Sequence, residues 1–84
     1  MKFKIIIEKP AQKFILKQPK NQQERLLNAI YLLPEMGDIK AMQGHKNLYR
    51  LRIGSYRIIY TVDNGILTVY VLEIGNRGDI YKQY

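Results

Sequence analysis

Apolar residues occupy every second position at the start of the chain, at Phe3, Ile5 and Ile7. Successive side chains of a strand point to opposite faces, so a period of two is typical of a strand with one buried face. The pattern therefore predicts a strand over residues 2–7.

The spacing of apolar residues then changes to that of two short helices. Pro10 suits the first turn of a helix, and an apolar stripe follows at Ala11, Phe14 and Ile15. Pro19 is expected to end this helix, and a second helix should start at about Asn21. Its apolar positions recur three and four residues apart, at Leu26, Leu27, Ile30 and Leu33. Pro34 and Gly37 indicate where it ends, so the two helices should form a hairpin.

β-Branched and aromatic residues dominate three later segments, 48–53, 56–62 and 66–73. Such composition is typical of strands. Gly54-Ser55 and Asn64-Gly65 separate these segments and predict two-residue hairpin turns. The expected order is β-α-α-β-β-β, with the first strand joining the other three. We expect an α+β fold over residues 1–84, a single domain in which a two-helix hairpin packs on one face of a small, mainly antiparallel, four-stranded sheet.

Two-residue turns determine which side chains share a face. Arg52 should lie opposite Arg57, and Tyr60 opposite Val69. The face expected to contact the helices is almost wholly apolar and carries Tyr49, Leu51, Ile53, Tyr56, Ile58, Tyr60, Val62, Leu67, Val69 and Val71. The other face carries Arg50, Arg52, Arg57, Ile59, Thr61, Thr68, Tyr70 and Leu72.

Three arginines are thus predicted to gather on the outer face of the sheet. Like charges directly opposite each other destabilise a sheet, and a domain of 84 residues has little stability to spare. A bound polyanion would explain Arg50, Arg52 and Arg57, because a guanidinium fork fits phosphate oxygens. The alternative is an ordinary solvated face.

The overall charge agrees with an anionic partner without identifying it. The chain has 14 Lys and Arg against 7 Asp and Glu, a net charge of +7. Such an excess favours a nucleic acid or an acidic protein as partner. The chain has no cysteine, and its first apolar run, three isoleucines before Glu8, is too short for a signal peptide. We expect a soluble, cytoplasmic protein with no membrane partner.

The segment after the last predicted strand holds two more candidates. Arg77 lies between glycines, and the ring of Tyr81 can stack on a base. Taken singly, each is as well explained as a surface charge or an anchor of the tail. His45, the single histidine, lies in a predicted loop, where such a residue more often has no catalytic role. No motif for a metal, a small-molecule cofactor or a phosphate loop is present, so none is expected.

Three segments together resemble the RelE/ParE toxin superfamily over nearly the whole chain. They read AMQG at 41–44, LYRLRIGSYRIIY at 48–60 and IGNRGDIY at 74–81. The resemblance implies the toxin of a type II toxin–antitoxin pair, neutralised by an acidic antitoxin that wraps around it.

RelE-like members of this superfamily cut mRNA on the ribosome without a metal. The 2′-hydroxyl attacks the adjacent phosphate and leaves a cyclic phosphate and a 5′-hydroxyl. Two lysines, two arginines and a tyrosine support this step. The resemblance implies that the catalytic set here is Arg50, Arg52, Arg57, Arg77 and Tyr81. The residues expected to bind RNA are Arg50, Arg52, Arg57 and Lys46.

The chain departs from the RelE pattern where Arg50 and Arg52 stand in place of the lysines. A guanidinium has a pKa above ~12 and cannot readily accept a proton. These arginines are therefore expected to hold phosphates and stabilise developing charge, and another group, for instance one from the ribosome, would be the base.

Two other functions fit the same resemblance. The ParE branch keeps the fold, lacks this ribonuclease site and inhibits gyrase. A degenerate member would only bind its antitoxin. The short chain and the presence of Arg57, Arg77 and Tyr81 favour the RelE-like ribonuclease.

Overall fold

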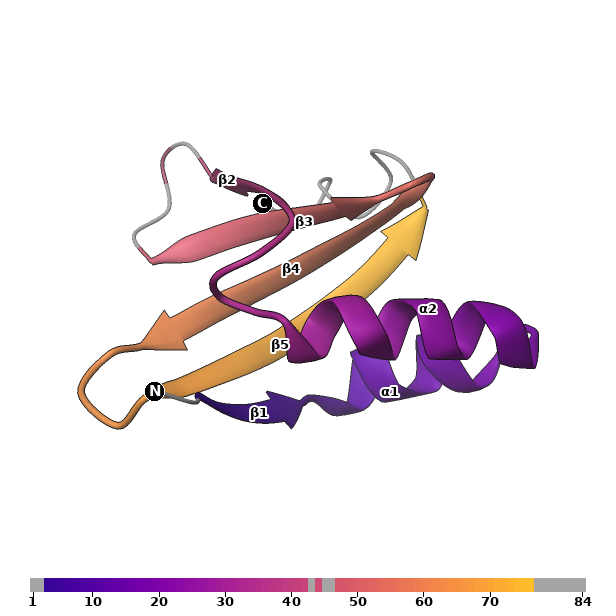
Figure 1. Ribbon diagram of the computed structural model, residues 1–84, viewed down its shortest axis with the longest axis horizontal. Coiled ribbons are helices and arrows are strands. Elements are labelled where there is room, and N and C mark those ends of the chain that lie inside the picture. Colours follow the sequence, from indigo (N-terminus) through magenta and orange to yellow (C-terminus); the bar gives the residue numbers. More distant parts are fainter. Residues whose placement is uncertain (1–2, 43, 45–46, 77–84) are drawn as a thin grey trace.

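The computed structural model describes residues 3–42, 44 and 47–76, which form two layers (Figure 1). The elements are β1 (Lys4–Ile7), α1 (Lys9–Leu16), α2 (Lys20–Tyr31), β2 (Asp38–Ala41), β3 (Leu48–Ile53), β4 (Tyr56–Asp63) and β5 (Thr68–Asn76). The sheet has the strand order β1-β5-β4-β3-β2. β1 pairs with β5 in parallel, and the other neighbours are antiparallel. The α+β fold with a helical hairpin on one face of the sheet is confirmed.

The helices form where the apolar spacing predicts them. Pro10 lies in the first turn of α1, where its missing N–H costs no hydrogen bond. Pro19 separates the helices and precedes α2 directly. Neither helix of the described residues is long and apolar enough to cross a membrane.

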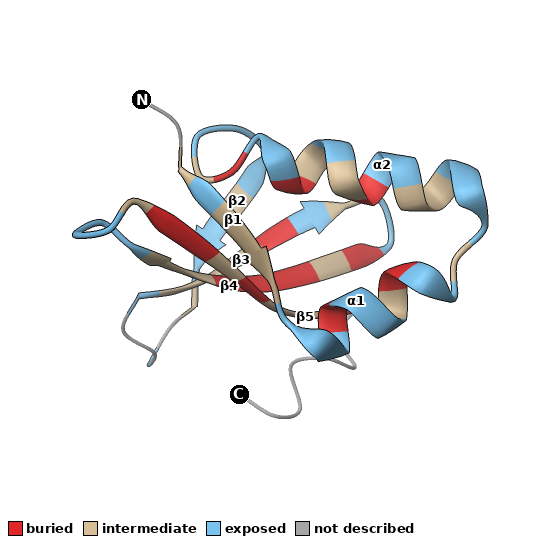
Figure 2. Ribbon diagram, turned by 90° about the horizontal axis from the view of Figure 1, so that it is seen from below, coloured by how far each residue is buried: buried red, intermediate tan, exposed pale blue. Residues whose placement is uncertain are grey.

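The hydrophobic core lies between the helices and the sheet (Figure 2). Phe14 of α1 meets Tyr56 of β4 edge to face, with ring centroids 5.9 Å apart. The buried cluster comprises Ala11, Ile15, Leu26, Ile30, Leu33, Leu51, Tyr56, Ile58, Tyr60, Val69, Val71 and Ile74. Complete burial of an aliphatic or aromatic side chain contributes roughly 1.5–3 kcal/mol, so this cluster is the main source of stability.

The sheet has five strands in the described residues, not the four predicted. The additional strand, β2, pairs antiparallel with the outer side of β3. Its middle residue Ile39 lies opposite Leu51 and packs against the core. β2 is only four residues long and contributes this single larger apolar side chain. Such a segment shows no repeated alternation, so its sequence between Gly37 and Gly44 does not differ from that of a loop.

The turn between β4 and β5 also differs from the prediction. Asp63 lies opposite Thr68, so residues 64–67 form the turn, not Asn64 and Gly65 alone. Asp63 Oδ1 accepts hydrogen bonds from the backbone N–H of Gly65 (2.9 Å) and of Ile66 (3.2 Å). This local side-chain capping stabilises a longer turn. Leu67 consequently lies in the turn instead of on the apolar face of a strand.

The longer turn changes the partners across β4 and β5. Tyr60 lies opposite Val71, and Val62 lies opposite Val69. The shift from the predicted pairing is two residues, so each of these side chains keeps its face. A bulge between Ile59 and Tyr60 then places one extra residue in β5.

Gly37 sits at a close approach just before β2. Its φ is +126°, and a Cβ there would lie 2.5 Å from Cδ1 of Leu51. We expect Gly37→Ala to lower the free energy of unfolding by about 1–3 kcal/mol, because both the backbone and a core side chain must shift. The matched control is Gly44→Ala, since Gly44 also has a positive φ (+83°) but meets no described atom within 4 Å. Urea unfolding of both variants tests this, and equal losses would show that the Leu51 contact is unimportant.

Tyr60 makes the stability of the fold change with pH in the alkaline range. It lies opposite Tyr49, with stacked rings 5.5 Å apart. Burial, and next the neighbouring Tyr49, raises the pKa of Tyr60 from its ordinary value of 10.0 to about 12. The unfolded state therefore loses this proton first, so the contribution of Tyr60 is complete below pH 10 and is lost as the pH rises toward 12.

Between pH 8 and pH 11, we expect the unfolding free energy of wild type to fall by about 1 kcal/mol more than that of the Tyr60→Phe variant. Denaturant unfolding of both proteins from pH 8 upward measures this difference. Parallel stability curves for the two proteins would contradict it.

Candidate nucleic-acid interface

The tight turn between β3 and β4 brings three arginines together. Arg52 lies directly opposite Arg57, as predicted, and Arg50 is two residues along β3. Their neighbours Leu51, Tyr56 and Ile58 belong to the core, so alternation puts the arginines on the face away from the helices. We call Arg50, Arg52 and Arg57 the arginine row.

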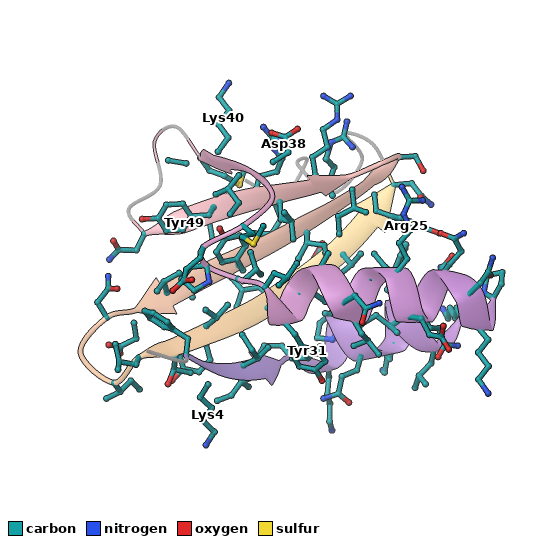
Figure 3. The ribbon with its side chains drawn as sticks, in the orientation of Figure 1. Lys4, Arg25, Tyr31, Asp38, Lys40 and Tyr49 are labelled. Carbon is teal, nitrogen blue, oxygen red and sulfur yellow. The ribbon has the colours of Figure 1, made fainter. Side chains whose placement is uncertain are left out.

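Arg57 is held by the turn beside it. Its Nη1 donates hydrogen bonds to the carbonyl oxygens of Gly54 (3.2 Å) and Tyr56 (3.1 Å). Arg25 of α2 lies close to the same turn (Figure 3). A Cβ built on Gly54 would lie only 2.9 Å from Nη2 of Arg25. Gly75 lies opposite Arg57 on β5 and adds no side chain. The Arg57 guanidinium is thus oriented by its own turn.

Arg50 is largely enclosed. Its side chain is 16% exposed, and Nη1 lies 3.7 Å from Oδ1 of Asp38. Nη1 is buried and meets no hydrogen-bond acceptor among the described residues. A buried donor without an acceptor costs about 1–3 kcal/mol, so an anion that reached this atom would be favoured.

β2 adds two charged residues that sequence reasoning missed. Asp38 lies opposite Arg52, and Lys40 lies opposite Arg50, so both share the face of the arginine row. Figure 3 shows both side chains projecting away from the helices. The signal that could have revealed them is the short alternation of Asp38, Ile39 and Lys40, with one apolar residue between two charges.

An apolar residue lies at the centre of this face. Ile59 of β4 lies opposite Arg50 on one side and Glu73 on the other, and it is completely buried. Across β4, Arg50 is therefore flanked by an apolar side chain, and Glu73 lies one strand further.

A polar hollow of about 510 Å³ lies toward the other end of β4. Thr61 and Tyr70 are cross-strand neighbours in its lining. The Thr61 hydroxyl donates a hydrogen bond of 2.6 Å to the carbonyl of Asn47, which has a φ of 61°. Amide, hydroxyl and phenol groups of this kind can contact ribose or base edges.

The arginine row does not stabilise itself. An opposed pair of like charges costs up to about 1 kcal/mol. The Arg50–Asp38 ion pair contributes little stability, because Asp38 is 61% exposed and exposed pairs contribute about 0–1 kcal/mol. Three arginines and Lys40 against Asp38 and, beyond Ile59, Glu73 leave an excess of positive charge suited to phosphate.

The structure brings together three of the six predicted site residues. Arg50, Arg52 and Arg57 are neighbours, whereas Lys46, Arg77 and Tyr81 lie outside the described residues. His45 lies outside them as well. Among residues 3–42, 44 and 47–76, no three His, Cys, Asp or Glu side chains cluster in a way that could hold a metal ion.

Several solved structures are similar to this fold. A chain of the archaeal RelE–RelB complex from Pyrococcus horikoshii is 30% identical, with a TM-score of 0.79 over 94% of this chain and 99% of that one. The RelB–RelE complex from Methanococcus jannaschii gives 26% identity and a TM-score of 0.75, over 94% and 98%. The isolated Escherichia coli RelE toxin shares the fold at 20% identity, with a TM-score of 0.70 over 96% and 93%.

Sequence comparison leads to the same group. No curated protein sequence matches the chain. A family model, the ParE toxin of the type II toxin–antitoxin system parDE, matches residues 5–81. Because that match covers nearly the whole chain, the protein belongs to the ParE toxin family of type II toxin–antitoxin systems, within the RelE/ParE superfamily.

Proposed function

We propose that this toxin is a metal-independent endoribonuclease that cuts mRNA on the ribosome and so stops translation in the cytoplasm. The observation that carries the proposal is the arginine row, in which Arg52 and Arg57 are directly opposed and Arg50 follows along β3. A bound anion would account for a row of cations that costs stability. RNA phosphate supplies one at each nucleotide.

The proposed chemistry is attack of a 2′-hydroxyl on the adjacent phosphate. Negative charge then grows on the phosphoryl oxygens. Guanidinium groups that are already oriented stabilise this charge more in the transition state than in the ground state. Arg57, tied to its own turn by two hydrogen bonds, is suited to this role, and Arg50 and Arg52 are assigned to hold the neighbouring phosphate oxygens.

We also propose an acidic antitoxin as the partner that restrains the toxin. The similar structures from Pyrococcus horikoshii and Methanococcus jannaschii are complexes of RelE with RelB. The net charge of +7 on this chain favours an acidic partner, because opposite potentials accelerate association.

A second candidate function is inhibition of gyrase. The family model that matches is that of the ParE toxins, and the chain lacks lysines at positions 50 and 52. One arginine of the row, Arg50, also already forms an ion pair with Asp38. These observations support a ParE-like target, and an assay of both activities separates the two functions.

Expression of the toxin alone is expected to arrest growth through cleavage of mRNA inside reading frames. Primer extension on ribosome-bound transcripts should reveal the cut ends, and purified gyrase should keep its supercoiling activity in the presence of the toxin. Intact transcripts together with inhibited supercoiling would assign the protein to gyrase.

Arg57→Ala should lower the single-turnover rate of cleavage on programmed ribosomes by about 10²–10³-fold, because one oriented donor is lost. Its stability should change by less than about 1 kcal/mol, since Arg57 lies outside the core and opposes a like charge. Arg57→Lys should restore activity only in part, because an ammonium cannot make a two-pronged contact.

The matched control is Lys13→Ala, which removes one exposed positive charge from α1 on the helical side. This variant should cleave like wild type. If Arg57→Ala melts like wild type and cleaves within threefold of it, Arg57 has no catalytic role.

A further inference from the structure

Cleavage by a 2′-hydroxyl requires a group that accepts its proton, and the arginine row cannot readily provide one. A guanidinium stays protonated throughout the useful pH range. Carboxylates are common general bases, provided that they lie within hydrogen-bond reach of the hydroxyl. The question is therefore which carboxylate on the outer face lies beside the arginines.

Three acidic residues of the described chain border this face. Asp63 lies at the far end of β4, and its carboxylate already accepts two backbone hydrogen bonds in the turn. Glu73 is half-buried on β5, beyond Ile59, and is already engaged with another group. Asp38 on β2 is 61% exposed and lies next to Arg50 and Arg52.

The geometry of Asp38 leaves its oxygens accessible. Oδ1 is 3.7 Å from Nη1 of Arg50, which is an ion pair longer than a hydrogen bond. The charged groups around Asp38 are Lys40 on its own strand, Arg50 and Arg52 on β3, and Arg57 one strand further. Phosphate and ribose of one nucleotide can therefore lie over cations and a carboxylate at the same time.

Asp38 lies at the edge of the arginine row. Neighbouring strands lie about 4.8 Å apart, so Asp38 on β2 is one strand from Arg52 and two strands from Arg57. The attacking hydroxyl and the phosphate that it attacks are adjacent groups of one RNA chain. A carboxylate at the edge of the arginine row can therefore contact the hydroxyl while the arginines contact the phosphate.

We propose, resting on the ribonuclease function proposed above, that Asp38 is the general base of this toxin. Its carboxylate takes the proton of the 2′-hydroxyl while the 2′-oxygen bonds to phosphorus. The bond from phosphorus to the 5′-oxygen breaks, and that oxygen takes a proton from water. The products are a 2′,3′-cyclic phosphate and a 5′-hydroxyl, and Asp38 then returns its proton to solvent.

The test is single-turnover cleavage on programmed ribosomes by wild type, Asp38→Asn, Asp38→Ala and Asp38→Glu. The matched control is Glu24→Gln, which removes the same charge from an exposed position on α2. Asp38→Asn should cleave about 10²–10⁴-fold more slowly, with ribosome binding no weaker than that of wild type. Asp38→Glu should recover part of the rate, and Glu24→Gln should match wild type.

Two further readouts separate a base from a residue that only positions Arg50. Without its base, Asp38→Asn should depend on hydroxide, so its rate should rise about tenfold per pH unit, more steeply than that of wild type. Added acetate should restore part of the rate of Asp38→Ala. Melting curves of all variants should match, because Asp38 is exposed and outside the core.

The outcomes are distinct. If wild type does not cut mRNA, the proposed ribonuclease function fails and the role of Asp38 fails with it. If wild type cuts and Asp38→Asn cuts within threefold of it, the function stands and Asp38 is not the base. If Asp38→Asn is slow but keeps the pH profile of wild type, and acetate does not help Asp38→Ala, Asp38 only positions Arg50 and the proposal is wrong.

Discussion

The alternation of side chains along β3 and β4 is the constraint on which the rest of this structure depends. Leu51 and Ile58 point to the helices, so Arg50 and Arg57 must point to the other side. One pairing register thus builds the hydrophobic core and the cationic face together. A shift by one residue would bury the arginines and expose the core, and the cost of buried, unpaired charge prevents it.

Most of the fold could be predicted because its hydrophobic patterns are long or clearly bounded. Pro10, Pro19 and Pro34 mark the limits of two helices, and Gly54-Ser55 sets the β3–β4 pairing correctly. β2 could not be found, because four residues with one larger apolar side chain contain no repeat. Its formation depends on pairing with β3, and the pattern of side chains within β2 alone does not reveal that pairing.

The part of the candidate site on β3 and β4 could be predicted from the sequence, and the part on β2 could not. Arg52 and Arg57 follow from the tight turn between their strands, whereas Asp38 and Lys40 depend on β2. The ion pair of Arg50 with Asp38 was missed for the same reason. The site expected from the sequence therefore contained no carboxylate, and the structure adds one to it. That addition changes the chemistry available, because proton transfer and phosphate binding no longer have to come from the same type of side chain.

The bulge between Ile59 and Tyr60 divides β5 into two parts that alternate out of phase. Before it, Val69 and Val71 face the helices, and after it Ile74 does. Both parts therefore contribute to the core, with Leu72 as the extra residue between Val71 and Glu73. Regular alternation from Val71 would turn Glu73 into the core and Ile74 to the outer face, so the extra residue keeps a carboxylate out of the apolar interior.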